Sequence, residues 1–225
     1  MWKGELTPNS SIPLGIGKFS STSNFNTEGN VMSLLYGDNF IGQTDLTSKN
    51  YTFAALFTNC SKLINAKNLS LPATTLASNC YQNMFQGCTA LTTAPQLPAT
   101  TLAENCYNGM FSGFSGLTTA PELTATTLAN NCYSYMFQGC TALTTAPELL
   151  ATTLANQCYT LMFLNCSNLN YIKAMFTTTP STTYTNGWVN GVASNGTFVK
   201  NSAATWNVTG VNGIPTNWTV ETAAA

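Results

Sequence analysis

The 225-residue chain contains no histidine and no arginine, and only 7% of its residues are charged. An average soluble domain carries about 25% charged residues. Without histidine, Ser-His-Asp and Cys-His nucleophile pairs are impossible, and imidazole metal sites are excluded with them. Without arginine there is no bidentate phosphate clamp, and a formal charge of −1 leaves no basic surface for nucleic acid. These absences point away from most enzymes and from nucleic-acid-binding proteins.

Long apolar runs are also missing. No stretch approaches the roughly 18 apolar residues of a transmembrane helix, so we expect no membrane insertion. The N-terminal segment MWKGELTPNSS contains Lys3 but no apolar run, so we expect no signal peptide within this chain.

A 26-residue repeat dominates the sequence. Its first regular block reads LPATTLASNCYQNMFQGCTALTTAPQ, and the regular blocks span residues 71–96, 97–122, 123–148 and 149–174. Residues 45–70 fit as a degenerate first repeat, because Phe57 and Cys60 match Phe85 and Cys88 at a separation of 28 residues. A unit this short cannot bury enough apolar surface alone, so we expect the repeats to stack on one another.

Within a block, the spacing of apolar residues predicts one short helix and short strands. Apolar positions i, i+1, i+4, i+5 and i+8 from Cys80 onward predict a helix over about residues 79–86, with Gly87 as its C-cap. The segment from Leu91 to Leu97 suits a short strand ended by proline. Strands stack about 4.8 Å apart and helices about 10 Å apart, so the stack is expected to curve with its strands on the concave face.

The Cys-x-x-Leu spacing preceded by Met-Phe-x-Gly, as in Met84 to Leu91, resembles the BspA-like leucine-rich-repeat proteins. The resemblance covers residues 45–174, with a repeat longer than the family's common unit. These are bacterial cell-surface proteins used in adhesion, so the resemblance implies an extracellular or cell-surface location. The fold class that we predict is α/β: a curved leucine-rich-repeat solenoid with short strands on the concave face, short helices on the other, and a β-rich C-terminal cap.

Composition changes on both sides of the repeats and suggests three regions. Residues 1–44, rich in Gly, Asn and Ser, are predicted to form an N-terminal cap, and residues 45–174 form the solenoid. In residues 175–225 the cysteine pattern stops, which predicts the β-rich C-terminal cap. Ser194 to Thr197 is typical of a hairpin turn.

Three tryptophans of this last region have two interpretations. We expect Trp188, Trp206 and Trp218 to form the core of the cap. The alternative is an aromatic platform that binds sugar.

The eight cysteines fall into two columns of equivalent repeat positions. One column is Cys80, Cys106, Cys132 and Cys158, and the other is Cys60, Cys88, Cys140 and Cys166. Phe114 takes the place of cysteine in the second column, which indicates a buried apolar position. We therefore favour buried thiols over disulfides or a zinc site, since the spacing of eight residues matches no zinc knuckle.

Polar columns supply the candidate binding surface. Asn79, Asn105, Asn131 and Gln157 form a column that we interpret as an amide ladder bonded to backbone groups. If Leu91 and Leu97 point inward, strand alternation turns Thr92 and Gln96 outward. The predicted binding face consists of Thr92, Gln96, Thr118, Glu122, Thr144 and Glu148.

We expect no catalytic residue, no cofactor and no metal. Glu122 and Glu148 are predicted to stand about 5 Å apart, a spacing that also suits retaining glycosidases, but repeat equivalence explains it. The predicted function is a monomeric, non-enzymatic, extracellular binding or adhesion module that recognises a protein or glycan on a host or neighbouring cell, with no nucleic-acid partner. The alternatives are a phage receptor-binding or decorative module and a purely structural spacer.

Overall fold

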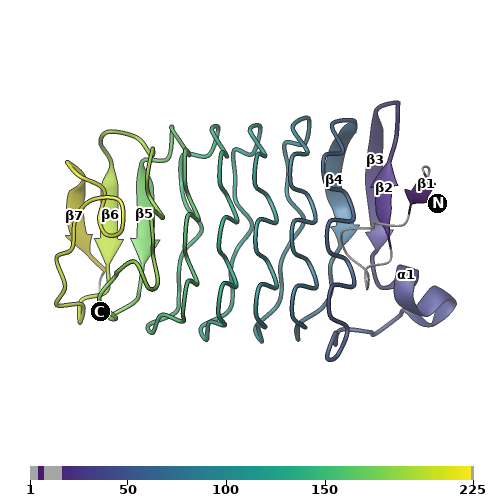
Figure 1. Ribbon diagram of the computed structural model, residues 1–225, viewed down its shortest axis with the longest axis horizontal. Coiled ribbons are helices and arrows are strands. Elements are labelled where there is room, and N and C mark those ends of the chain that lie inside the picture. Colours follow the sequence, from purple (N-terminus) through teal and green to yellow (C-terminus); the bar gives the residue numbers. More distant parts are fainter. Residues whose placement is uncertain (1–4, 8–16, 224–225) are drawn as a thin grey trace.

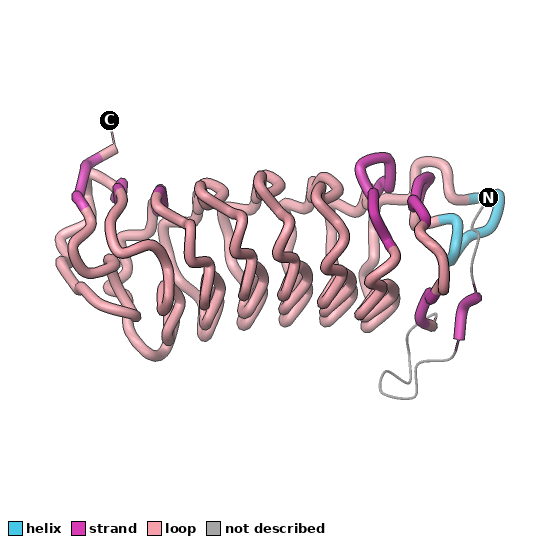
Figure 2. Tube along the Cα trace, turned by 90° about the horizontal axis from the view of Figure 1, so that it is seen from above, coloured by secondary structure: helices cyan, strands magenta, loops and turns pink. Residues whose placement is uncertain are grey.

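The computed structural model describes residues 5–7 and 17–223, with side chains from residue 17 onward. The chain forms a row of coils that follow one another in a nearly straight line (Figures 1 and 2). Strands are confined to the two ends of the row. Residues 1–4 and 8–16 of the predicted N-terminal cap lie outside the described residues.

The N-terminal end of the row contains two small sheets and the helices. Strands β1 (Glu5–Thr7) and β2 (Lys18–Ser20) pair in antiparallel fashion. Strands β3 (Phe25–Asn30) and β4 (Leu63–Ser70) pair in parallel. The connection between β3 and β4 includes helix α1 (Ser33–Tyr36) and the 3-10 helix η1 (Gly37–Asn39).

The C-terminal end is a three-stranded parallel sheet. Its strands are β5 (Tyr171–Ala174), β6 (Thr197–Lys200) and β7 (Thr219–Thr222), in that spatial order. The predicted hairpin at Ser194 to Thr197 is wrong, because β6 pairs in parallel with both of its neighbours. Each strand instead belongs to a further coil of the row (Figure 1).

The helix predicted in each block is wrong, and no helix occurs in residues 45–174, all of which the structure describes. In the first regular block every fourth residue of the predicted helix and its C-cap has a left-handed backbone: φ is +60° at Asn79, +55° at Asn83 and +70° at Gly87. An α-helix needs negative φ throughout, so these residues interrupt it at every turn. We call residues 79–88 and their equivalents in the other repeats the turn ladder.

Backbone amides of the turn ladder alternate between two kinds of partner. The N–H of Tyr81 donates to the carbonyl of Cys106 in the next coil at 3.0 Å. The N–H of Gln82 donates within its own coil, to the carbonyl of Asn79 at 3.1 Å. The same alternation recurs in each coil and joins neighbouring coils along the whole repeat region. Stability on this side therefore comes from hydrogen bonds between coils as well as within them.

The turn ladder also explains why the row is straight. The predicted curvature required helices on one side that are wider than the strands on the other. With turns in place of helices, neither side of a coil carries an element that is wider than the other side. The predicted fold, an α/β curved leucine-rich-repeat solenoid with short strands on its concave face and short helices on the other, is therefore wrong.

In the repeats, the strands that form contain no proline. The segment predicted as a strand, Leu91 to Leu97, is not one, and it contains a proline that lacks an N–H donor. The equivalent segment of the last block, Leu169 to Ala174, has no proline, and β5 forms within it. Strand β4 likewise contains no proline. Continuous parallel strands thus occur at both ends of the row, and in the middle parallel pairing is reduced to isolated bridges such as that between Thr75 and Thr101.

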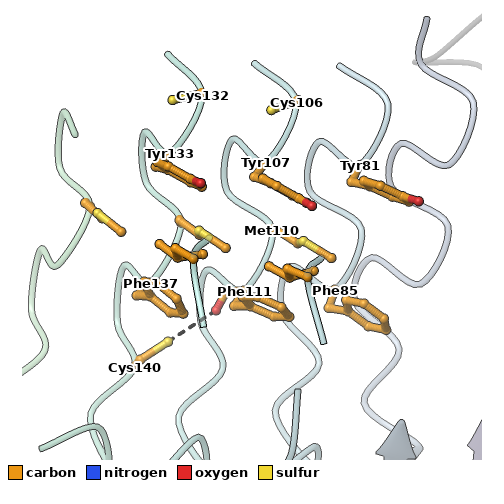
Figure 3. Packing of buried hydrophobic residues seen from close by; sticks show 14 of the residues in the cluster. Tyr81, Phe85, Cys106, Tyr107, Met110, Phe111, Cys132, Tyr133, Phe137 and Cys140 are labelled. Atoms are coloured by element: carbon orange, nitrogen blue, oxygen red, sulfur yellow. Dashed lines mark hydrogen bonds between the residues drawn. The ribbon is translucent and has the colours of Figure 1, made fainter. Parts of the chain in front are cut away.

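Two columns of stacked aromatic rings run through the core (Figure 3). Tyr107 stacks on Tyr81 and Tyr133, with ring centroids 5.8 and 5.9 Å apart. Phe111 stacks in the same way on Phe85 and Phe137, at 5.9 and 5.8 Å. These separations lie in the favourable range for aromatic pairs. Because every ring of the columns is buried, each coil contributes the same apolar layer to one continuous core.

All eight cysteines are buried free thiols. In the second column the thiols contact the preceding coil: Cys88 Sγ donates to the Phe57 carbonyl at 3.0 Å, and Cys140 Sγ to the Phe111 carbonyl at 3.3 Å (Figure 3). Burial raises the pKa of Cys88 and Cys166 to about 12. The prediction of buried thiols is confirmed.

The column that begins at Asn79 serves the backbone rather than an amide ladder. All four of its residues have left-handed φ angles between 52° and 60°. Asparagine adopts this conformation more readily than most residues. Among these four side chains, the one hydrogen bond is a long contact in which Asn108 Nδ2 donates to Asn105 Oδ1 at 3.5 Å.

The tryptophans near the C-terminus are buried, with exposed fractions of 0% for Trp188, 5% for Trp206 and 7% for Trp218. Each indole N–H donates to a backbone carbonyl, as Trp188 does to Gly213 at 2.9 Å. The prediction that they form a core is confirmed, and the sugar-binding platform is wrong because the rings are covered.

Candidate functional site: an exposed proline-containing strip

The six predicted site residues lie on three equivalent segments, one in each of three successive coils. We call residues 92–98, 118–124 and 144–150 together the proline strip, because each contains the sequence Thr-Thr-Ala-Pro. Thr92, Gln96, Thr118, Glu122, Thr144 and Glu148 are all exposed. Leu91 and Leu97 are buried, so their side chains have the inward orientation that the alternation predicted. The role of the six residues in binding stays a prediction.

The backbone of the strip lacks partners in its first two segments. Among the residues that the structure describes, none donates a backbone hydrogen bond to, or accepts one from, residues 92–98 or 118–124. In contrast, the third segment pairs with β5: the N–H of Leu149 donates to the carbonyl of Lys173 at 3.0 Å. Unpaired peptide groups are stable only where water or a ligand can reach them. The first two segments therefore present free donors and acceptors.

The side chains of the strip add hydroxyl groups and few charges. Thr93, Thr119 and Thr145 are exposed next to the predicted threonines, so two threonines stand side by side in each coil. Their exposure was not predicted, since strict strand alternation turns one of each pair inward. The proline that follows each pair of threonines was the signal available in the sequence, because a segment that contains proline does not keep the alternation of a strand.

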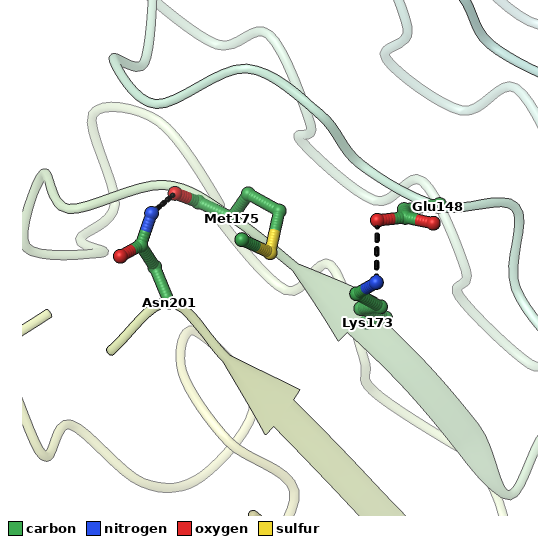
Figure 4. Close-up of polar contacts among 4 residues, drawn as sticks. All are labelled: Glu148, Lys173, Met175 and Asn201. Atoms are coloured by element: carbon green, nitrogen blue, oxygen red, sulfur yellow. Dashed lines mark hydrogen bonds and ion pairs between the residues drawn. The ribbon is translucent and has the colours of Figure 1, made fainter. Parts of the chain in front are cut away.

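One residue of the strip, Glu148, forms an ion pair with a residue of β5. Lys173 Nζ lies 2.7 Å from Glu148 Oε1, and both side chains are partly exposed (Figure 4). The hydrogen bond to Glu148 raises the pKa of Lys173. Beside this pair, Asn201 Nδ2 donates to the carbonyl of Met175, the residue that follows β5, at 2.9 Å and so joins the next coil to this one (Figure 4). The C-terminal border of the strip is thus fixed by polar contacts.

Two grooves cross the strip between coils. One, of about 450 Å³, is lined by residues that include Glu122, Leu123, Glu148 and Leu150. The other, of about 270 Å³, lies between β4 and the first segment and is lined by residues that include Lys67 and Gln96. Sequence reasoning missed both grooves, because they depend on the spacing of adjacent coils.

The described part of the chain contains no cluster of three histidine, cysteine or acidic residues that could hold a metal ion. Within the same residues, no helix is long and apolar enough to cross a membrane. Comparison with known proteins finds no matching family model, no matching curated protein and no matching solved structure. The resemblance to BspA-like proteins therefore stays a prediction.

Proposed function

We propose that this protein is a non-enzymatic binding module whose contact surface is the proline strip. The observation that carries the proposal is the contrast between the two long sides of each coil. The turn ladder uses its backbone groups to join neighbouring coils, whereas residues 92–98 and 118–124 leave theirs without partners in the described protein. A surface with free peptide groups and paired threonine hydroxyls can bind an extended polymer through many short hydrogen bonds.

The strip offers little chemistry for catalysis. Its acidic residues, Glu122 and Glu148, are both exposed to water, whereas an acid–base pair needs one of its carboxyl groups in a water-excluded environment. The low charge of the chain implies weak electrostatic steering, so binding depends on contacts at short range. Together with the sequence resemblance, these features support a module that acts outside the cell on a surface protein or glycan.

A matched pair of triple variants tests the proposal. The strip variant Thr92→Ala/Thr118→Ala/Thr144→Ala removes three exposed hydroxyls from the strip. The control Thr100→Ala/Thr126→Ala/Thr152→Ala removes three exposed hydroxyls from other positions of the same coils. Neither set of hydroxyls makes a hydrogen bond within the described protein, so both variants should fold as the wild type does.

Wild type and both variants are applied to arrays of peptides and glycans. We expect the wild type and the control to bind the same probes, and the strip variant to lose them. Equal binding by the two variants would place the contact surface elsewhere. Wild-type protein that binds no probe would support the structural spacer instead.

A further inference from the structure

Resting on the proposed function, we propose a class of ligand for the larger groove: an extended peptide that carries a lysine next to an apolar side chain. The groove has a volume of about 450 Å³ and lies between the second and third segments of the proline strip. Pro121, Leu123, Pro147 and Leu150 give it an aliphatic lining, and Glu122 and Glu148 supply its two carboxylates. An aliphatic lining with acidic groups is complementary to a side chain with an apolar stem and a cationic end, such as lysine.

The repeat itself shows how an ammonium group sits on this surface. Lys173 belongs to the coil after Glu148 and places its Nζ 2.7 Å from the Glu148 carboxylate. Glu122 is the residue equivalent to Glu148 one repeat earlier. In the coil after Glu148, the residue opposite it is Lys173, because Leu149 pairs with Ala174. In the coil after Glu122, the equivalent residue is Glu148. Glu122 therefore has an acidic residue, and no lysine, opposite it in the next coil. No side chain of the described protein forms an ion pair with Glu122 there.

A peptide fits this groove better than an amino sugar for two reasons. The lining residues include no aromatic ring on which a sugar could stack. The backbone of Glu122, Leu123 and Thr124 has free N–H and carbonyl groups, which match the alternating donors and acceptors of an extended peptide. Leu150 is 37% exposed, so it is available to an apolar side chain beside the lysine.

Isothermal titration calorimetry with two synthetic peptides tests the proposal. The first is acetyl-Ala-Val-Lys-Val-Ala-amide, and the second carries norleucine in place of lysine and so removes only the ammonium group. We expect the lysine peptide to bind, and the norleucine peptide to bind at least about tenfold more weakly. Equal affinity for the two peptides would overturn the proposal.

Three variants locate the binding. Glu122→Gln should weaken the lysine peptide by about tenfold, whereas the control Glu104→Gln, which removes an exposed charge from the same repeat outside the groove, should leave it unchanged. Lys173→Met should strengthen binding several-fold, because it frees the Glu148 carboxylate for the ligand. A gain of affinity cannot arise from misfolding.

The outcomes separate this inference from the proposed function. If Glu122→Gln and Glu104→Gln bind the lysine peptide equally, the inference fails. The proposed function still stands in that case, provided that the strip variant loses its array probes. An oligomer of glucosamine that binds more tightly than the peptide would overturn the assignment to a peptide and move the ligand to amino sugars.

Discussion

Replacing Gly109 with alanine distinguishes the turn ladder from a helix by the sign of its effect on stability. Gly109 lies in the middle of the segment that the apolar spacing predicts as helical, and its φ is +62°. In an exposed helix interior, alanine is more stable than glycine by about 1 kcal/mol. In a left-handed conformation, an L-residue other than glycine costs about 1–2 kcal/mol. The two structures thus predict opposite changes.

The environment of Gly109 increases the expected loss. A Cβ atom placed there would lie 2.1 Å from Oδ1 of Asn83 in the preceding coil, so the Asn83 side chain has to rotate away. Against this, alanine restricts the unfolded chain and recovers about 0.4–1 kcal/mol. We expect Gly109→Ala to lower the free energy of unfolding by about 1 kcal/mol or more. For a protein of this size, that corresponds to a fall in melting temperature of about 2–4 °C.

Urea unfolding followed by circular dichroism and by tryptophan fluorescence measures the change. The reverse substitution, Tyr135→Gly, is the matched comparison, because Tyr135 occupies the equivalent position in the next coil with φ of +59° and is 37% exposed. Glycine relieves the backbone there, so its cost in stability should be smaller than that of Gly109→Ala. A Gly109→Ala variant that is more stable than the wild type would refute the left-handed turn and would show that this segment is a helix.

Two further predictions concern the thiols and the proline strip. Burial raises the pKa of Cys88 and Cys106 to about 12, whereas thiols of an unfolded chain titrate near 8.5. Above a pH of about 8.5, the unfolded chain releases thiol protons that the folded chain keeps. The free energy of unfolding is therefore highest below a pH of about 8.5, and above it falls by up to about 1.4 kcal/mol per pH unit for each thiol. Urea midpoints measured between about pH 7 and 10 test this, and a constant midpoint would contradict it. In hydrogen–deuterium exchange, the amides of residues 118–120 and 122–128 should exchange much faster than those of Tyr107 and Phe111, which donate to the next coil; equal protection would show that the strip amides have partners.

The burial pattern of this protein could be predicted from the sequence, but the backbone conformation that produces the pattern could not. The columns of Cys132 and Tyr133 were recognisable because identical side chains recur every 26 residues, and both residues are buried. Apolar residues at i, i+4 and i+8 fit a helix of 3.6 residues per turn and equally fit turns that repeat every four residues. The distinguishing signal lay in Asn79, Asn83 and Gly87, three residues at four-residue intervals whose types, asparagine and glycine, suit positive φ. From the sequence alone, Gly87 is instead assigned to a helix C-cap and Asn79 to an amide ladder.

The candidate site was predictable in part for a similar reason. The outward orientation of Thr118 and Glu122 followed from the buried leucines around them. The loss of backbone pairing did not follow, because it depends on how Pro121 interrupts hydrogen bonding between neighbouring coils. The segment that contains Pro147 still pairs with the proline-free β5 through the amides of Ala146 and Leu149, so the position of the prolines alone did not show which segments pair. The groove between Glu122 and Glu148 needed the coordinates of two adjacent coils together.

The straightness of the row has a consequence for how this protein can change in length. Since neither side of a coil is wider than the other, inserting or duplicating one block moves the two ends apart by about 5 Å and leaves their directions unaltered. An inserted copy of block 71–96, 97–122 or 123–148 also brings its own Thr-Thr-Ala-Pro segment to the same outer surface. Gene duplication of a single unit can therefore extend the reach of the molecule and multiply its contact points in one step.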